Sequence, residues 1–583
     1  MHTHILPHTY VALRLPSESL KVVQLVPNTT TSLGKYGSFS TNRLFGRPYN
    51  LTFEILDRQP GETQSSLRIV PAAELQADLQ SDSQSSTLEA PDGVVVETVD
   101  GVEYEVVGAD GKMVMRSNRA IRDDPGRQKL TMDEIEELKT QATSAGKDII
   151  ARLLSSHSAI DQKTTFSLAK YTLRKTRKYL RRFTVLPLDV PTLAHWLMTE
   201  KEPSKILELR EEMLALIESW ANIHYTQPDP VGLSRPEGGM IGGGRWLVVD
   251  ETGGLLVAAL ADRLGILYLD LQETATQKLT VLPEDEDPVS SAIDASVTHA
   301  TAAAEHDHHH PPGMAARHNT LTVLHAHAQP NLAVLKYFLF DSSNPSPKHP
   351  LYTHLKSLSW LQLLSPSEDA GYTEPEVMAD DVLATWKSGK RGTYYRKRRR
   401  WERIRSVVDE TRQGGFDGLV IASMMNPSTI LQHALPLLRG GAPITIYSPY
   451  IEPLAELADL YSTARRAAFL TSAVDPADLP TEDFPLNPAL LLSPTVQTAK
   501  LRRWQCLPGR THPLMTARGG AEGYLFTGTR VIPVEGKVEA RGKFKKRKVT
   551  KAPVEDEHTG TTSDASSLPI AVPAGGVSIE GHS

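Results

Sequence analysis

Cysteine is nearly absent from this sequence, and it contains no long uninterrupted apolar run. Cys506 is the one cysteine among 583 residues, so no internal disulfide and no thiolate metal cluster can form, which is typical of a reducing compartment. The most apolar stretch, residues 255–269, contains Asp262 and Arg263 and falls short of the ~20 residues that a membrane-spanning helix needs. Residues 1–10 lack the apolar core of a secretory signal. We therefore expect a soluble intracellular protein with no membrane partner.

Sequence signals for metal binding and for nucleophilic catalysis are also lacking. His306 and residues 308–310 form a histidine cluster in a polar tract, but no second motif has the spacing of metal ligands. Cys506 and the scattered serines and histidines have no context that suggests a catalytic triad. We therefore expect no metal site and no catalytic residue in this chain.

The charge of the chain is segregated into blocks. A formal net charge of −6 conceals acidic and basic segments, so it does not argue against nucleic-acid binding, which needs only a local basic surface. At 583 residues the chain is too long for one hydrophobic core. We expect two or three domains.

The first part of the chain predicts strands and then helices. Residues 1–122 contain short alternating segments between turn signals, which predict a small β-barrel with a disordered loop. Residues 123–235 predict a helical linker. Thr131 and Glu134 fit a capping box at its first helix, Gly146 is expected to end that helix, and a second short helix follows.

From residue 236 the pattern changes to alternating strands and helices. It predicts an α/β fold, a doubly wound Rossmann-like sheet of the methyltransferase kind over residues 236–534. Two segments, 272–317 and 341–395, interrupt this domain, and residues 535–583 predict a disordered basic tail. The expected elements are strands at 246–250, 266–270, 320–325, 419–422 and 444–447, closing strands near 489–506 and 523–531, and helices at 255–264, at 332–340 and around Trp360.

The most informative stretch is a basic helix expected over residues 163–183. At ~100° per residue one narrow stripe holds five cations, and Lys175, Lys178 and Arg182 broaden it on one side. A solvated amphipathic helix is the alternative. Surface helices normally mix charges of both signs, however, so this stripe favours a nucleic-acid phosphate backbone as its ligand. The stripe comprises Lys163, Lys170, Arg174, Arg177 and Arg181.

Two further basic blocks follow. Arg396 and Arg398 belong to the block 394–405, where aromatic residues beside arginines could stack on unpaired bases. A solvated helix start or a nuclear import signal explains this block equally well. Residues 543–551 in the tail resemble an import signal, from which we expect a nuclear location.

The turn after the strand at 246–250 is where a methyltransferase would hold S-adenosylmethionine. Such sites need glycines so that the backbone can approach the ligand at a helix N-terminus. Here Asp250 supplies the acidic position, but only Gly254 occupies a glycine position, and Thr252 and Leu256 occupy the others. Their side chains would fill space that the cofactor needs. We therefore expect a methyltransferase fold with a degenerate cofactor site.

Motifs of one family occur in residues 27–39, 124–138, 166–179, 248–255, 507–513 and 523–525. Together they resemble the non-catalytic subunit of the eukaryotic tRNA methyltransferase that makes 1-methyladenosine at tRNA position 58. The matches spread over most of the chain, which argues against coincidence. The departures lie mainly in the insertions and the tail.

The resemblance implies a heterotetramer with two copies each of this chain and of a catalytic methyltransferase subunit. The partner would bind S-adenosylmethionine, whereas this chain would bind no cofactor and would supply surface for tRNA. Arg510 and His512 are weaker RNA-binding candidates, because a buried structural motif fits them as well. The tRNA-contacting residues that the resemblance implies are Lys163, Lys170, Tyr171, Arg174, Lys175, Arg177 and Lys178.

Two alternatives belong to other functional classes. The chain could be an S-adenosylmethionine-dependent RNA methyltransferase active on its own, against which Thr252 and Leu256 argue. It could also be an RNA-binding scaffold in translation initiation, which the basic helix by itself does not exclude. Neither alternative accounts for both a complete fold and an eroded cofactor turn as well as a specialised subunit does.

Overall fold

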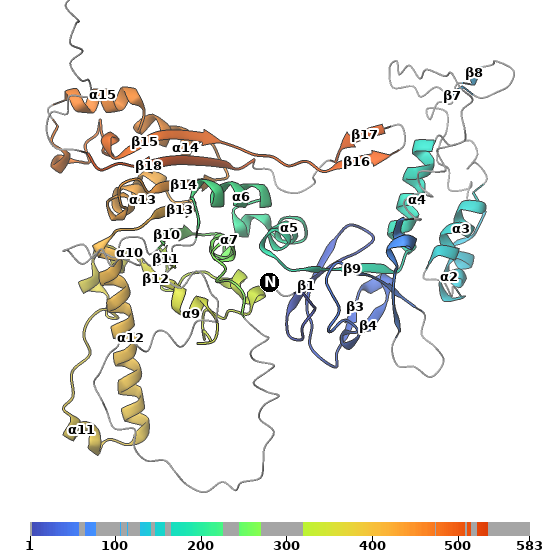
Figure 1. The fold of residues 1–583 in the computed structure, drawn as a ribbon, viewed down its shortest axis with the longest axis horizontal. Helices are drawn as coiled ribbons and strands as arrows, with labels where there is room; N and C mark the ends of the chain where they lie inside the picture. The colour runs from blue at the N-terminus through green and yellow to red at the C-terminus, as the bar shows by residue number, and fades with distance from the viewer. Residues whose placement is uncertain are drawn as a thin grey trace, which may run out of the picture. The chain divides into compact units, whose positions relative to one another are not determined.

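A computed structural model describes most of the chain (Figure 1). Lys163, Asp270, the insertion 272–317 with its histidine cluster, and the tail 535–583 lie outside the described residues. The described residues are 3–56, 65–76, 105–106, 113–114, 129–141, 146–157, 165–224, 244–269, 319–472, 474–507, 510–514 and 522–533.

An antiparallel five-stranded sheet forms the N-terminal domain. Its strands are β1 (Tyr10–Arg14), β2 (Leu20–Gln24), β5 (Thr52–Ile55), β6 (Leu67–Ile69) and β9 (Arg182–Pro187), in the order β2-β1-β9-β5-β6. Phe39 and Phe53 stack on Phe183 with ring centroids 4.6 and 5.6 Å apart, so segments distant in sequence share one core. Smaller elements of this region are β3 (Thr30–Ser32), η1 (Gly34–Tyr36), β4 (Ser38–Ser40), η2 (Thr41–Arg43), β7 (Glu105–Val106) and β8 (Met113–Val114).

Strand β9 differs from the expectation of a helix that runs to residue 183. It pairs with β1 and β5, so the middle of the N-terminal sheet comes from beyond the boundary expected at residue 122. Phe183 and Val185 are at most 1% exposed, and this burial in the sheet outweighs continuation of the helix. Arg181 therefore lies past the basic helix, where its carbonyl accepts a hydrogen bond from the amide of Ile55. Arg182 does not broaden the basic stripe either, because it lies in β9, buried and paired with Glu54.

Between β6 and β9 in the described part of the chain, residues 72–76 are helical, and α2 (Met132–Gln141), α3 (Lys147–Ser155) and α4 (Thr165–Tyr179) follow. The capping box at α2 is confirmed, because the Glu134 amide donates to Thr131 Oγ1 at 3.3 Å and the Thr131 amide donates to the Glu134 carboxylate at 2.7 Å. Helix α2 is described as far as Gln141, and residues 142–145 lie outside the described part of the chain; Gly146 stands at the start of α3 with a φ of 91°.

The second sheet has seven strands in the order β12-β11-β10-β13-β14-β18-β15. Their bounds are β10 (Arg245–Asp250), β11 (Thr320–His325), β12 (Leu355–Ser359), β13 (Gly418–Ala422), β14 (Pro443–Ser448), β15 (Leu491–Gln497) and β18 (Tyr524–Arg530). The first five are parallel, and β18 is antiparallel to both of its neighbours. This mixed, doubly wound sheet confirms the predicted fold class.

Two strand expectations in this domain are wrong. Residues 266–269 form no strand; Ile266 and Leu267 are fully buried, so their apolar run reflects core packing rather than a ladder. Conversely, β12 lies inside segment 341–395, which was expected to interrupt the domain. Strand β12 is an edge strand in which only Leu358 is fully buried. It therefore lacks the apolar run from which a strand can be predicted in the sequence.

Helices cover both faces of this sheet. Trp246 and Val248 of β10 pack in one core with α5 (Val190–Glu200), α6 (Glu211–Trp220) and α7 (Leu255–Arg263). Leu247 and Val249 point into the other core, with α12 (Ser388–Gln413), α13 (Pro427–Ala434) and α14 (Glu452–Leu460). Burial on both faces explains why β10 is continuously apolar.

The remaining described helices are short. Residues expected to form a helix at 332–340 form a 3-10 helix instead, whereas the helix around Trp360 is confirmed. None of the described helices combines the length and apolarity needed to cross a membrane. The short helices are η6 (Pro203–Ile206), η8 (Ala333–Phe338), α9 (Leu351–His354), α10 (Trp360–Leu364), η9 (Pro366–Glu368), α11 (Asp380–Thr385), η10 (Leu435–Leu437), α15 (Thr463–Thr471), η11 (Pro476–Asp478) and η12 (Pro488–Leu490).

A hairpin extends from the closing strands of the second sheet (Figure 1). It consists of β16 (Trp504–Leu507) and β17 (Arg510–Pro513), paired antiparallel. Residues 507 and 510–513 of the family motif expected at 507–513 therefore lie in this hairpin, and residues 508–509 lie outside the described part of the chain.

Candidate nucleic-acid interface and cofactor turn

The turn between β10 and α7 satisfies its polar groups internally. The Asp250 carboxylate accepts hydrogen bonds from the Thr252 amide and hydroxyl, both at 2.6 Å, and from the Val257 amide at 3.2 Å. Thr252 Oγ1 in turn accepts from the Leu256 amide at 3.0 Å. Burial raises the pKa of Asp250, and these hydrogen bonds oppose the rise. The acidic residue of the turn is thus used to cap α7.

The segment after β11 lies directly on this turn. A Cβ atom added to Gly254 would come 3.0 Å from the Cα of Leu332, and the Val334 amide donates to the Gly253 carbonyl at 3.0 Å. Thr252 is fully buried. A cofactor held by a glycine-rich turn needs open access to the backbone at the helix N-terminus. The residues present do not fit S-adenosylmethionine in that manner.

Helix α4 presents its cations on more than one side. Lys170, Arg174 and Lys178 are one turn apart along the helix, which makes one stripe of three exposed side chains. Tyr171 is half-buried, with its ring edge-to-face with His157, and Lys175 Nζ lies 4.8 Å above the Tyr171 ring. Burial lowers the pKa of Lys175, and the nearby Lys178 lowers it further. The stripe, rather than Tyr171 or Lys175, is available to a large polyanion.

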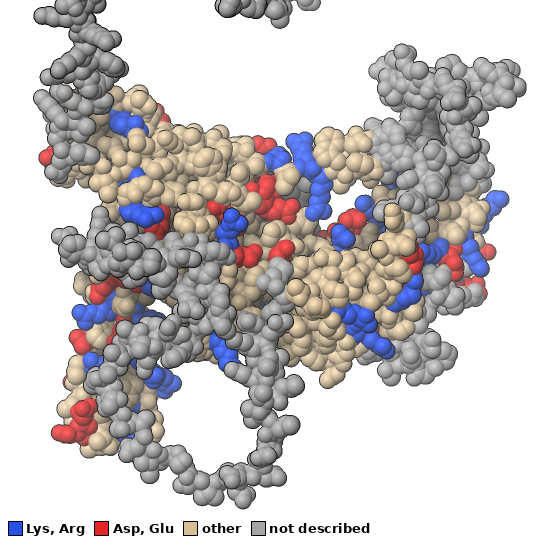
Figure 2. Space-filling model, viewed as in Figure 1, with Lys and Arg blue, Asp and Glu red and all other residues tan. Residues whose placement is uncertain are grey.

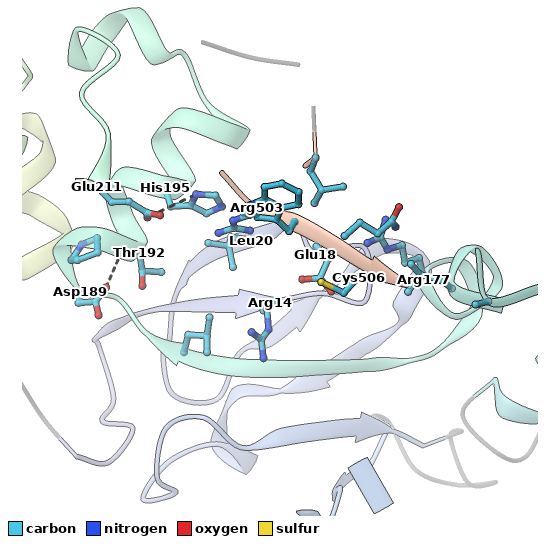
Figure 3. Close-up of a pocket in the computed structure, with 17 residues that line it drawn as sticks. Arg14, Glu18, Leu20, Arg177, Asp189, Thr192, His195, Glu211, Arg503 and Cys506 are labelled. Atoms are coloured by element: carbon cyan, nitrogen blue, oxygen red, sulfur yellow. Dashed lines mark hydrogen bonds and ion pairs between the residues drawn. The ribbon is translucent and has the colours of Figure 1, made fainter. Parts of the chain in front are cut away.

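Arg177 is partly exposed and lines a cavity of about 1010 Å³ that opens to solvent (Figure 3). Arg14 of β1 and Arg503, which precedes β16, line the same cavity, together with the exposed Trp504. Arg14, Arg503 and Trp504 were not predicted from the sequence. Arg503 and Trp504 are neighbours in the sequence, but Arg14 lies far from both, so only the fold brings Arg14 and Arg503 to one cavity.

Glu18, Asp189 and Glu211 are the acidic residues that line this cavity, and the last two have structural partners. Asp189 caps α5 by accepting from the Thr192 amide at 2.8 Å. Glu211 lies 4.0 Å from His195. Burial raises the pKa of Glu211, which Arg503 opposes; burial and Arg503 together lower the pKa of His195.

The weaker candidates are placed differently from one another. Arg396, on α12, is exposed and bonds within its helix, to the Gly392 carbonyl and the Thr393 hydroxyl. Arg398 is half-buried and lies 3.4 Å from the Glu402 carboxylate. On the hairpin, His512 is half-exposed beside the Pro513 carbonyl, while Arg510 is described through its backbone pairing with Leu507. Within the described ranges, no three histidine, cysteine or acidic residues are grouped as metal ligands would be.

The fold and the turn define a class: a methyltransferase-type domain whose glycine turn is occupied by its own side chains, joined to a domain with a cationic helix. Residues 4–387 match the model of the Gcd10p family. The chain belongs to the Gcd10p family.

Curated relatives agree over nearly the whole chain. A protein of Aspergillus fumigatus is 48% identical, covers 94% of this chain and 96% of its own length, and is named tRNA (adenine(58)-N(1))-methyltransferase non-catalytic subunit trm6. A Schizosaccharomyces pombe protein of the same name is 28% identical over 92% of this chain and 94% of its own. Among solved structures, the tRNA (m1A58) methyltransferase TrmI from Aquifex aeolicus aligns with 91% of this chain and 100% of its own at 10% identity, with a TM-score of 0.34.

Proposed function

We propose that this chain is the non-catalytic subunit of a tRNA (adenine-58-N1)-methyltransferase and that it pairs with a catalytic subunit that binds S-adenosylmethionine. Membership of the Gcd10p family supports this assignment. The observation that carries the non-catalytic role is the turn at Asp250, where Thr252 and Leu256 are fully buried at positions that a cofactor site keeps as glycine. Two copies of each subunit are the expected assembly.

The role of this chain is to hold tRNA. Position 58 lies in the folded T-arm, so the adenine must be exposed before it reaches the partner's active site. Enzymes that extrude a base offset the cost of unstacking by contacts outside the reacting base. Lys170, Arg174 and Lys178 on α4 supply such contacts to phosphates, and Arg177 contacts RNA that enters the cavity beside Arg503.

The first experiment measures methyl transfer to unmodified tRNA by this chain alone, by the catalytic subunit alone and by their mixture. Full activity only in the mixture is expected, together with no S-adenosylmethionine binding to the isolated chain by calorimetry. Methyl transfer by this chain alone would overturn the proposal. Mass measurement of the mixture tests the two-plus-two assembly.

The RNA-binding role of α4 is tested separately by the double variant Lys170→Ala/Arg174→Ala. Each phosphate that the variant no longer neutralises should reduce the slope of log K against log salt by about 0.7–0.9. The matched control is Lys205→Ala/Lys348→Ala, which removes the same charge from exposed positions away from α4. An unchanged slope in the α4 variant would remove this helix from the interface.

A nuclear location is also part of the proposal, and it rests on the basic block at 543–551. Replacing Lys545, Lys546, Arg547 and Lys548 with alanine should move a fluorescently tagged chain out of the nucleus. Unchanged nuclear fluorescence would contradict the role given to this block.

A further inference from the structure

The N-terminal half of α12 concentrates positive charge. Between Asp381 and Glu402 the sequence has eight lysines and arginines and no acid, and seven of the eight are exposed. Lys390 and Arg391 lie in the first turn, where the helix macrodipole is already positive and where no acidic residue is present. Figure 2 shows lysine and arginine side chains along this helix. This arrangement is self-repelling until an anion binds.

The C-terminal half of the same helix is neutralised and anchored. Trp401 and Val408 are buried, and Trp401 Nε1 donates to the Tyr372 carbonyl at 3.0 Å. Arg405 pairs with Asp409 at 3.5 Å. The sheet domain therefore holds one end of α12, and the cationic half is presented on a fixed support.

An exposed aromatic ring lies within the cationic half. Tyr394 is held in place, because its hydroxyl accepts from the Met378 amide at 3.2 Å and its ring meets Trp386 edge-on at 5.9 Å. The ring of Tyr395 contacts that of Tyr394, with centroids 5.4 Å apart, yet Tyr395 remains 43% exposed. An exposed tyrosine supported from behind is a stacking surface.

Two arginines flank this ring. Arg391 and Arg399 lie four residues before and after Tyr395, so all three side chains share one face of the helix. Arg399 Nε also donates to the Tyr395 carbonyl at 3.4 Å. Arg398, in contrast, is directed to Glu402 and to the Tyr394 hydroxyl. The face that can meet a ligand is therefore Arg391–Tyr395–Arg399 and not Arg398.

We propose that this face binds an unpaired RNA segment, with a base stacked on Tyr395 and the adjoining phosphates on Arg391 and Arg399. Base faces are accessible only where RNA is single-stranded, and aromatic rings between cations are the usual means of binding it. A duplex or an acidic peptide would use the arginines and leave the ring unused. The inference rests on the proposed function for its substrate class, and it adds a second RNA-binding surface, on a different domain from α4.

The test uses the full chain and measures the Kd for single-stranded oligouridine and for an RNA hairpin duplex of equal charge. Tyr395→Ala should weaken oligouridine binding about 5- to 150-fold, the range expected when one base is no longer stacked, and should change duplex binding less than about twofold. Tyr395→Phe keeps the ring and should restore binding. Arg391→Gln/Arg399→Gln should lower the salt slope by about 0.7 for each phosphate that is no longer neutralised.

Three results would overturn this inference: unchanged oligouridine binding by Tyr395→Ala, an equal loss for the duplex, or competition by polyglutamate as strong as that by oligouridine. Thermal melting of each variant verifies that it is folded. If only the inference about α12 fails, the mixture of subunits still methylates tRNA, and the α4 variant still shows a reduced salt dependence of tRNA binding. If the proposed function fails, the mixture has no activity whatever Tyr395 does.

Discussion

The hydroxyl of Thr252 donates a 2.6 Å hydrogen bond to the Asp250 carboxylate and accepts one of 3.0 Å from the Leu256 amide. A glycine at residue 252 could make neither. The position that leaves room for a cofactor in a glycine-rich turn is thus occupied here by a group that stabilises the turn itself. The Thr252 side chain therefore both fills the space that a cofactor would need and stabilises the fold.

Thr252→Val should therefore destabilise the folded chain. Valine leaves the Leu256 amide without its acceptor in a fully buried site, which costs about 1–3 kcal/mol, while Asp250 keeps its hydrogen bond from the amide of residue 252. Urea unfolding measures the change, and Thr252→Ser, which keeps the hydroxyl, is the control. Equal stability of the valine variant and the wild-type chain would contradict this role.

Arg182→Met should also lower stability. Arg182 Nε lies 2.9 Å from the Glu54 carboxylate, and both side chains are 5% exposed. The substitution leaves the buried Glu54 carboxylate with Arg68 as its remaining cation. Removing one member of such a pair costs about 3 kcal/mol. Arg68, which contacts Glu54 from a side chain that is 41% exposed, provides the control: Arg68→Met should cost clearly less. Equal losses would show that burial does not set the cost.

Gly146→Ala tests the close approach of α3 to the end of α4. A Cβ atom there would come 2.2 Å from the Tyr179 carbonyl oxygen, and the φ of 91° disfavours any side chain. Gly34→Ala is matched in having a positive φ, but nothing lies within 4 Å of its Cβ position. We expect about 1 kcal/mol of destabilisation for Gly34→Ala and a larger loss, with faster amide exchange in α3, for Gly146→Ala. The reverse order would refute the close approach.

His349 predicts a dependence of stability on pH. Its Nδ1 accepts from the Leu351 amide at 3.2 Å, so Nε2 carries the proton and donates to the Phe338 carbonyl at 3.1 Å. Burial lowers its pKa to about 4 from 6.5. Folding favours the neutral form of His349. The free energy of unfolding is therefore not reduced by this group above pH 6.5, and it falls by up to about 3 kcal/mol as the pH decreases toward 4. In His349→Gln the urea midpoint of unfolding should depend less on pH between 6.5 and 4. An unchanged dependence on pH would contradict the role assigned to His349.

Local chemistry explains which elements could be predicted. The capping box of Thr131 and Glu134 needs only neighbouring groups, and the strands β10, β11, β13 and β14 are apolar because both faces of the sheet are covered. Residues 266–267 and β12 were misjudged for the converse reason. An apolar run reports burial and not pairing, and an edge strand with half-exposed side chains leaves no run at all.

The candidate site divides in the same way. The amino-acid sequence by itself determined two features of the site. Acidic residues are absent along α4 and along the N-terminal half of α12, and the cofactor turn lacks two of its glycines. Both features depend only on which residue types stand at which positions. Only the tertiary structure decided that Arg181 leaves the basic helix, that Arg14, Arg177 and Arg503 meet around one cavity, and that Leu332 covers Gly254. Those relationships depend on strand pairing and packing between residues far apart in the sequence, and their free energy comes from burying surfaces that no local pattern identifies.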